Sequence, residues 1–270
     1  MPELSKDTAL CISLSGRPSN IGTRFHNYLY AELGLDFVYK AFTTTDIAAA
    51  IGGVRALGIR GCSVSMPFKE AVIPLVDHIE PSAAAIGSIN TIVNDGGVLT
   101  ASNTDYEAIA SLIDSHRLDP AASVLVRGSG GMAKAVVAAF HGAGFADVTV
   151  LARNAEAGPA LAAAYGFGWI ADDPEPGAAI IVNVTPLGMD GADAETLAFS
   201  AAHIAAAHTV FDVVAFPAET PFIRAARAAG TDVITGAEVI ALQAAGQFAR
   251  YTGVTPTADQ VARASAHSRA

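Results

Sequence analysis

Short apolar runs alternate with amphipathic segments in the first part of the chain, up to residue 102. Three runs have the length and composition of β-strands: residues 9–14, 37–42 and 62–65. Two segments between them place an apolar residue at every third or fourth position, which predicts helices: 23–33 and 45–57. Pro67 ends the third run. Because proline suits the first turn of a helix, we expect a further helix from Phe68 to Val76.

Two β-prone runs, 89–93 and 98–102, flank the turn sequence Asn94-Asp95-Gly96-Gly97 and predict a hairpin. The pattern then predicts a helix from Asp105 to about His116. Strands and helices in alternation, with one hairpin among them, are typical of an α/β domain whose sheet is mixed and mainly parallel.

Beyond Leu118-Asp119-Pro120, which has the composition of a domain junction, short buried strands recur with helices between them. The expected strands are 123–126, 148–151, 180–184, 210–214 and 232–235. This alternation predicts a doubly wound parallel sheet. No strand follows the two final helices, 238–251 and 257–265, so they are free to pack back on the first domain. We therefore expect one domain of residues 1–104 with 238–270, and a second of 105–237.

The composition narrows the function classes. Of the 270 residues 51% are hydrophobic and 16% charged, as in compact globular proteins. The net charge of −10 and the lack of a Lys/Arg run argue against a nucleic-acid partner. No apolar run reaches membrane-spanning length, and residues 1–10 lack the basic and apolar parts of a signal peptide. We expect a cytoplasmic protein that binds small molecules, as a monomer or homodimer.

The cysteines and histidines suggest no redox or metal chemistry. Cys11 and Cys62 each lie in an apolar, strand-like run, which favours two buried free thiols over a disulfide or a redox pair. No His-x-x-x-His pair with an acid nearby is present, so we expect no metal centre.

A glycine-rich turn follows the strand 123–126. Glycines between a strand and a helix let a diphosphate approach backbone N–H groups at the positive end of the helix. Ala133 stands at the third glycine position of the dinucleotide fingerprint, which the fingerprint allows. The simpler alternative is a glycine-rich turn that binds no ligand. The candidate cofactor-binding residues of this turn are Gly128, Ser129, Gly130, Gly131 and Met132.

The end of the next strand bears on the choice of cofactor. Sites for NAD place Asp or Glu there, whereas the 2′-phosphate of NADP needs a cation. The sequence here is Ala152-Arg153-Asn154, and an arginine can bind the phosphate and stack on adenine. The sequence therefore favours NADP; otherwise Arg153 is an ordinary surface arginine.

Two ionisable residues of the first half could move a proton in a hydride transfer, which needs a positioned acid. Lys69 falls in the first turn of the helix predicted after Pro67, where the positive end of the dipole favours loss of its proton. Asp105 opens the helix after the hairpin. Each residue has a simpler interpretation when it is considered alone. Lys69 would be an ordinary surface lysine, and Asp105 would be an acidic residue that the helix dipole stabilises in the first turn.

Taken in order, the segments resemble the shikimate dehydrogenase family over essentially the whole chain. Residues 63–70, S-V-S-M-P-F-K-E, are similar to the family's N-V-T-x-P-x-K stretch. Residues 85–91 are similar to its A-x-A-V-N-T motif, and 103–105 to its N-T-D motif. The glycine turn comes next, and the segments that follow it in family order are 183–189, 219–221 and 243–245.

The resemblance implies a substrate-binding domain, a Rossmann domain that binds NADP, and reversible reduction of 3-dehydroshikimate to shikimate in a cleft between the two. It implies Lys69 and Asp105 as the acid–base pair. By the same resemblance, the substrate-binding residues are Ser65, Asn90 and Gln243. Further cofactor-binding residues are Arg153, Thr185, Gly188, Met189 and Gly236.

Several positions depart from the family pattern. The early S-x-S-P loop, whose serines hold the substrate carboxylate, is shorter here and reads S-N-I-G-T-R at 19–24. Asn20, Thr23 and Arg24 are the candidates to replace those serines. Asp212 begins a D-x-x-Y motif that lacks its tyrosine, and Glu238 and Val239 replace a glycine and a methionine. In the adenosine-phosphate motif only Arg153 survives, with Ala152 and Ala157 at two other positions.

The altered loop is more similar to the shikimate dehydrogenase-like branch, whose members turn over shikimate poorly. We therefore expect an NADP-dependent oxidoreductase acting weakly on shikimate or on a close cyclic hydroxy acid. Two alternatives stay open at this point: a dehydrogenase for quinate or an amino analogue, and a nucleotide-binding sensor with vestigial catalysis.

Overall fold

The computed structural model describes residues 4–269, and the chain divides into two compact units. The first is Met1–Thr104 with Ala241–Ala270, and the second is Asp105–Ile240. The chain leaves the first unit at the start of α4 (Thr104–Ser115) and re-enters it within α9 (Gly236–Thr252). The segment Leu118-Asp119-Pro120, which has the composition of a junction, lies inside the second unit.

The first unit contains a six-stranded mixed sheet in the order β2-β1-β3-β5-β6-β4. β1 is parallel to β2 and β3, and β4 is parallel to β6, while β5 is antiparallel to β3 and β6. The mixed sheet and its hairpin confirm the prediction. The strands are β1 (Ala9–Ser15), β2 (Phe37–Thr43), β3 (Gly61–Val64), β4 (His78–Ile79), β5 (Thr91–Asp95) and β6 (Val98–Ser102).

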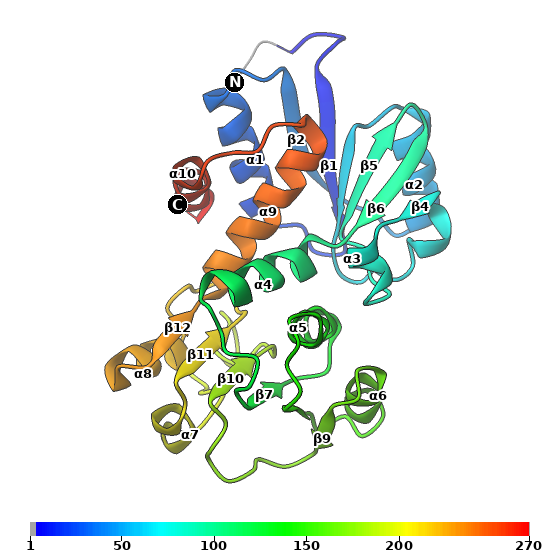
Figure 1. The fold of residues 1–270 in the computed structure, drawn as a ribbon. Helices are drawn as coiled ribbons and strands as arrows, with labels where there is room; N and C mark the ends of the chain where they lie inside the picture. The colour runs from blue at the N-terminus through cyan, green and yellow to red at the C-terminus, as the bar shows by residue number, and fades with distance from the viewer. Residues whose placement is uncertain (1–3, 270) are drawn as a thin grey trace. The chain divides into compact units, whose positions relative to one another are not determined.

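Each face of this sheet is buried under its own helices. α1 (Ile21–Glu32), α10 (Ala258–Arg269) and the end of α9 cover one face, where Cys11, Phe25 and Phe248 pack together (Figure 1). α2 (Ile47–Ala56) covers the other face, where Ile12 packs with Ile51. Neighbouring residues of a strand point to opposite faces, so Cys11 and Ile12 enter different cores.

The helix predicted for Phe68–Val76 is wrong. This stretch consists of turns and one 3₁₀ turn, η1 (Ile73–Leu75), and α3 (Pro81–Ala84) follows β4. Pro74 would lie inside the predicted helix, where its ring clashes with the preceding turn and it has no N–H to donate. The backbone is satisfied differently: Ile89 N donates to Lys69 O at 2.8 Å.

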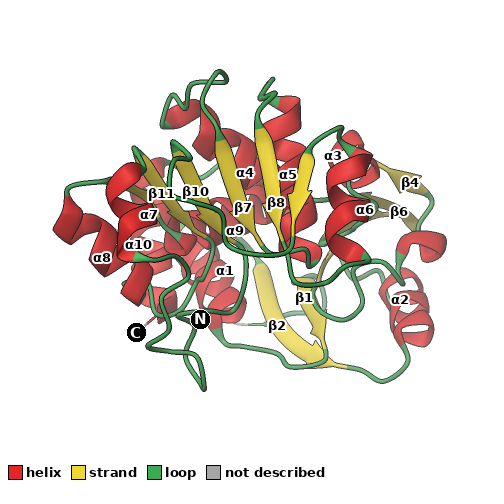
Figure 2. Ribbon diagram, turned by 90° about the horizontal axis from the view of Figure 1, so that it is seen from below, coloured by secondary structure: helices red, strands yellow, loops and turns green. Residues whose placement is uncertain are grey.

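The second unit is a six-stranded parallel sheet in the order β12-β11-β10-β7-β8-β9. Figure 2 shows β11, β10, β7 and β8 side by side. The strands are β7 (Val124–Arg127), β8 (Val148–Leu151), β9 (Gly168–Ile170), β10 (Ile180–Asn183), β11 (Thr209–Asp212) and β12 (Asp232–Ile234). The helices between them are α5 (Gly131–Gly142), α6 (Ala157–Ala164), α7 (Ala201–Ala206) and α8 (Pro221–Ala229).

This arrangement confirms the doubly wound fold and adds β9, which the sequence pattern did not predict. The chain order reverses at β7, whose neighbours are β8 on one side and β10 on the other. Ligands of doubly wound sheets bind at such a switch point, beyond the carboxyl ends of the strands.

Gly61 marks a close contact in the core of the first unit. A Cβ added to Gly61 would lie 2.3 Å from Cδ1 of Tyr251, a ring atom on α9. Tyr251 is 1% exposed, so the ring has no room to move aside. β3 can therefore approach α9 only with glycine at this position.

We expect Gly61→Ala to lower the free energy of unfolding by about 1–3 kcal/mol or more, because it overpacks the core against Tyr251. Gly52→Ala is the matched control, since Gly52 lies in α2 and an added Cβ would meet no atom within 4 Å. This control should gain about 0.5–1 kcal/mol from helix propensity. Urea unfolding measures both, and equal effects of the two variants would contradict the packing argument.

Candidate functional site

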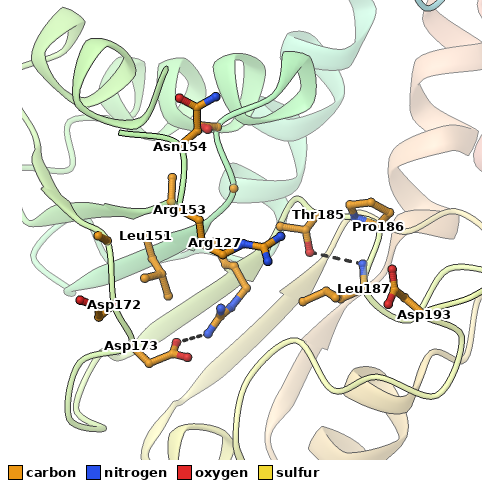
Figure 3. Close-up of a pocket in the computed structure, with 14 residues that line it drawn as sticks. Arg127, Leu151, Arg153, Asn154, Asp172, Asp173, Thr185, Pro186, Leu187 and Asp193 are labelled. Carbon is orange, nitrogen blue, oxygen red and sulfur yellow. Dashed lines mark hydrogen bonds and ion pairs between the residues drawn. The ribbon is translucent and has the colours of Figure 1, made fainter. Parts of the chain in front are cut away.

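A cavity of about 780 Å³ lies at the carboxyl ends of β7, β8, β9 and β10 in the second unit (Figure 3). Four of the residues predicted to bind a cofactor line it: Gly128, Ser129, Arg153 and Thr185. It lies at the switch point, as expected for a dinucleotide site. The other lining residues are Arg127, Leu151, Ala152, Asn154, Ala171, Asp172, Asp173, Pro186, Leu187 and Asp193.

The glycine turn has the geometry that a diphosphate needs. Gly128 has a φ of +125°, and an added Cβ would lie 2.8 Å from Val184 Cγ2, so only glycine fits there. Gly130 is the N-cap of α5 and Gly131 its first residue; both are exposed, and an added Cβ on either would meet nothing within 4 Å. Half-buried Met132 follows. The helix N-terminus is thus open to an anion.

Arg153 lies two residues after the end of β8 and is exposed at the cavity. The neighbouring Asn154 is occupied by the backbone: its Oδ1 accepts from Glu156 N at 3.0 Å and from Ala157 N at 2.9 Å. Arg153 is therefore the cation that the end of β8 offers to a ligand. The residues of this cavity fit a dinucleotide whose ribose carries a phosphate.

A set of hydrogen bonds shapes the loop after β10. Thr185 Oγ1 donates to Asn183 Oδ1 at 2.6 Å, and Asn183 Nδ2 donates to Leu187 O at 3.1 Å. These bonds hold Thr185 and Leu187 at the wall of the cavity. Gly188 and Met189, also predicted to bind the cofactor, do not line it: Gly188 N donates to Asp193 O, and Met189 is 46% exposed.

Gly236, the remaining predicted cofactor residue, is the first residue of α9 and does not line the cavity. A Cβ added there would lie 2.1 Å from Val214 O. The glycine is thus explained by the close approach of two backbone segments. Glu238, which replaces a family glycine, has a structural contact as well: its Oε2 accepts from Thr235 N at 2.8 Å at the start of the helix.

Asp212 is fully buried at the end of β11 and accepts hydrogen bonds from three groups. Asn183 Nδ2 and Val214 N donate to its Oδ1 at 3.0 and 3.1 Å, and Thr220 Oγ1 donates to its Oδ2 at 2.6 Å. Burial raises the pKa of Asp212 to about 6, against the lowering effect of these donors. The carboxyl group joins β10, β11 and the N-terminus of α8.

In the first unit, Asn90 is held in one orientation. Its Oδ1 accepts from Thr104 N at 2.8 Å, Thr104 Oγ1 at 3.1 Å and Thr91 Oγ1 at 2.8 Å. Its Nδ2 is buried and finds no acceptor among the residues that the structure describes. Because the oxygen is saturated, the Nδ2 group is the part of this amide that still lacks a hydrogen-bond partner among the described residues.

Gln247 of α9 also contacts Asn90 and its neighbours, although the sequence motifs do not predict it as a site residue. Its Nε2 lies 3.2 Å from Ser63 Oγ, 3.2 Å from Asn90 O and 3.1 Å from Thr91 Oγ1. The predicted Gln243 lies one turn earlier on α9 and is half-buried. The four-residue spacing of the two glutamines, which puts them on one helix face, is the signal that could have identified Gln247.

Lys69 and Asp105 are both tied to the neighbourhood of Asn90. The carbonyl of Lys69 accepts from Ile89 N, next to Asn90, and Asp105 directly follows Thr104, which Asn90 anchors. Lys69 is half-buried and Asp105 is 5% exposed. The helix whose positive end was expected to act on Lys69 is absent, so that part of the prediction is wrong.

Ser65 follows β3 and is half-buried; its N donates to Leu14 O at 2.9 Å. The β1–α1 loop starts beside this turn, since Gly16 N donates to Met66 O at 3.0 Å. Asn20, at the end of that loop, is the exposed N-cap of α1, and its side chain makes no capping bond.

Thr23 does not lie with the other predicted substrate-binding residues. It lines a second cavity, of about 630 Å³, together with Arg24, Asn27 and His267, and none of Ser65, Asn90 and Gln243 lines this one. The structure therefore does not bring Thr23 or Arg24 together with Asn90 as carboxylate ligands.

The described residues also bear on the predicted thiols, on metal binding and on membrane spans. Cys11 and Cys62 are free and buried, as predicted, and burial raises the pKa of both thiols. Within residues 4–269, no group of three or more His, Cys, Asp or Glu side chains could hold a metal ion. None of the helices described there is long and apolar enough to cross a membrane.

Comparison with known proteins agrees with this geometry. A protein of Haemophilus influenzae named shikimate dehydrogenase-like protein is 58% identical over 267 residues, which cover 98% of both chains. The chain belongs to the shikimate dehydrogenase family. The model of the shikimate dehydrogenase substrate binding domain matches residues 20–92. The resemblance inferred from the motifs is thus confirmed.

Two further members of the shikimate dehydrogenase family extend the comparison. The shikimate dehydrogenase (NADP(+)) of Moorella thermoacetica is 34% identical, and the match covers 94% of this chain and 91% of that one. The crystal structure of the Thermus thermophilus enzyme in complex with NADP(H) and shikimate superposes with a TM-score of 0.87 at 27% identity, covering 96% and 99% of the two chains. The fold class is confirmed by this match.

The buried carboxyl group of Asp212 predicts a pH-dependent stability. Its pKa is raised above the unfolded value of 3.8, so the native state binds the proton more tightly than the unfolded chain. The stabilisation is complete below about pH 4 and is lost as the pH rises through about 6. The shift corresponds to about 3 kcal/mol.

Asp212→Asn removes this titration. From pH 4 to pH 7 we expect the wild type to lose about 2.5 kcal/mol of unfolding free energy relative to the variant. Denaturant unfolding at several pH values measures it, with Asp232→Asn as an exposed control in the same sheet. A difference that stays constant with pH would contradict the raised pKa.

Proposed function

We propose that this member of the family is an NADP-dependent oxidoreductase that interconverts a ring ketone and a secondary alcohol on shikimate or a close cyclic hydroxy acid. The main support is the arrangement around Asn90. Lys69 is bound through its carbonyl to one neighbour of this residue, and Asp105 follows the threonine that its side-chain oxygen anchors. The backbone of Lys69 is thus hydrogen-bonded next to Asn90, and the backbone of Thr104, the residue before Asp105, is hydrogen-bonded to Asn90 itself. This supports Lys69 as the proton donor and Asp105 as its carboxylate partner.

The second unit would hold the cofactor. The N–H groups at the start of α5, beside Gly128 and Gly130, would bind the diphosphate, and Arg153 would bind the 2′-phosphate. When bound, NADPH supplies the hydride that adds to the carbonyl carbon. The relatives that carry NADP in their names or structures support this choice.

Lys69 would donate a proton to the ketone oxygen during reduction and take it back during oxidation, with Asp105 as its acid–base partner. The Nδ2 group of Asn90 would donate a hydrogen bond to a substrate oxygen, since its own oxygen is saturated. Ser65 and Gln243 would complete substrate binding. Gln247 would act through Asn90, as a positioning residue, by holding its backbone carbonyl.

The substrate carboxylate has lost its family ligands, which favours weak activity on shikimate itself. The loop that should carry two serines offers Asn20 instead, and Thr23 lines a separate cavity. One missing contact to a charged group costs about 1.5–3 kcal/mol, or roughly a tenfold to hundredfold fall in kcat/KM. A dehydrogenase for quinate or an amino analogue is the second candidate, since the loop that differs from the family is the one whose serines hold the substrate there.

We expect Lys69→Met to lower turnover about a hundredfold or more while leaving the Kd for NADPH unchanged, because it removes the proton donor alone. Lys40→Met is the matched control, since Lys40 lies over Phe42 at an exposed part of β2. The assay follows NADP reduction with shikimate, quinate and their amino analogues.

Wild-type turnover by the Lys69 variant would overturn the assignment of the proton donor. Tight NADPH binding by the wild type without turnover of any of these acids would instead support a nucleotide sensor and overturn the proposed reaction.

A further inference from the structure

We propose that Arg127 and Asp173 recognise the adenine base of the dinucleotide and exclude bases with the opposite hydrogen-bonding pattern. The inference rests on the proposed function, because it names how one end of that cofactor site selects its ligand. It concerns two residues to which the motif analysis gave no role.

Arg127 is the last residue of β7 and lines the cavity with Asp173, which follows β9. Its Nη2 donates to Asp173 Oδ1, and Figure 3 shows the two side chains joined in the cavity. The guanidinium carbon lies 4.7 Å from the centroid of the Phe199 ring, which covers one face. The Nε atom is buried without a hydrogen-bond partner among the described residues.

Stability alone does not account for an arginine here. Its β7 neighbours Leu125 and Val126 are buried, and so is Leu151, which is opposite Arg127 in the register of β7 and β8. An aliphatic side chain could pack on Phe199 without losing the hydration of a charge. A partly buried ion pair is often no more stable than such packing. A charge at this position therefore indicates a ligand.

The position of the pair points to the base of the ligand. Arg127, Arg153 and Asp173 lie at the ends of three adjacent strands, β7, β8 and β9, with Arg153 on the middle one. The residue after the second strand of a dinucleotide fold binds the adenosine ribose or its phosphate. The groups on either side of Arg153 are then within the part of the cavity that receives the adenosine.

The chemistry of the pair matches adenine. Adenine presents an amino donor, N6, beside a ring-nitrogen acceptor. A carboxylate that accepts beside a guanidinium that donates is complementary to that edge. Hypoxanthine has an oxygen in place of the amino group, so it would place an acceptor against the accepting carboxylate oxygen of Asp173 instead of a donor. Such a mismatch costs about 1.5–3 kcal/mol, or roughly ten- to hundredfold in Kd.

The test separates the base from the 2′-phosphate with four dinucleotides: NADP, NAD and the two counterparts that carry hypoxanthine in place of adenine. Calorimetry gives a Kd for each with the full-length protein, so no turnover is needed. We expect the wild type to bind each adenine form about tenfold or more tighter than its hypoxanthine counterpart.

Asp173→Asn should abolish or invert this preference, because the amide can donate to the hypoxanthine oxygen. Arg127→Met should reduce the preference and weaken NADP and NAD by the same factor. Arg153→Met should do the opposite: it should remove the gain from the 2′-phosphate and keep the preference for adenine.

Arg224→Met is the matched control, since Arg224 pairs with Glu195 at the surface and does not line the cavity. It should change none of the four Kd values. The Tm of Arg127→Met should equal or exceed that of the wild type, which a purely structural arginine would not allow.

Equal binding of both bases by the wild type would overturn the inference, as would an unchanged preference in Asp173→Asn. A loss confined to NADP in Arg127→Met would make Arg127 a phosphate ligand and also overturn it. Absence of binding by all four dinucleotides would reject the cofactor site itself, and with it the proposed function.

Discussion

The arrangement of the candidate substrate-binding residues in the first unit depends on the side-chain oxygen of Asn90, which accepts three hydrogen bonds. Its three donors are the hydroxyl of Thr91, which is the first residue of β5, and the backbone N–H and hydroxyl of Thr104, where the chain enters α4. Gln247 binds the carbonyl of the same residue from α9. A buried amide that lost these partners would pay the full cost of desolvation. The strand end, the start of α4 and the end of α9 are therefore fixed together.

In the second unit a buried carboxyl group likewise holds several elements together through its hydrogen bonds. Asp212 binds Asn183 of β10 and Thr220 at the start of α8, and Asn183 in turn holds the loop that carries Thr185. The family tyrosine that should follow Asp212 is missing, yet the carboxyl group retains a structural role. Substrate-loop changes and an intact framework thus coexist in this chain, which is the pattern expected when specificity changes on a conserved scaffold.

The charges of the cofactor cavity are not those that a minimal NADP site needs. Arg153 is sufficient for a 2′-phosphate in principle, whereas Arg127 with Asp173 adds a donor and an acceptor at a position where aliphatic packing is available. The arginine stays ordered because Phe199 covers one face and the carboxylate holds one edge. Such preorganisation lowers the entropic cost of binding a flat ring.

The periodicity of the sequence determined most strands and helices, the hairpin at Gly96-Gly97 and the glycine turn, because these depend on neighbouring residues. It failed at 68–76, where Pro74 prevents a helix, and it missed the short strand β9, which has only three residues. Motifs led to Asn90 and Arg153, and the spacing from Gln243 is a signal for Gln247, but the contacts of Gln247 and Asp173 emerged only from the tertiary structure. Their partners lie far away in the sequence, and no local pattern encodes which distant backbone carbonyl or guanidinium a side chain will meet.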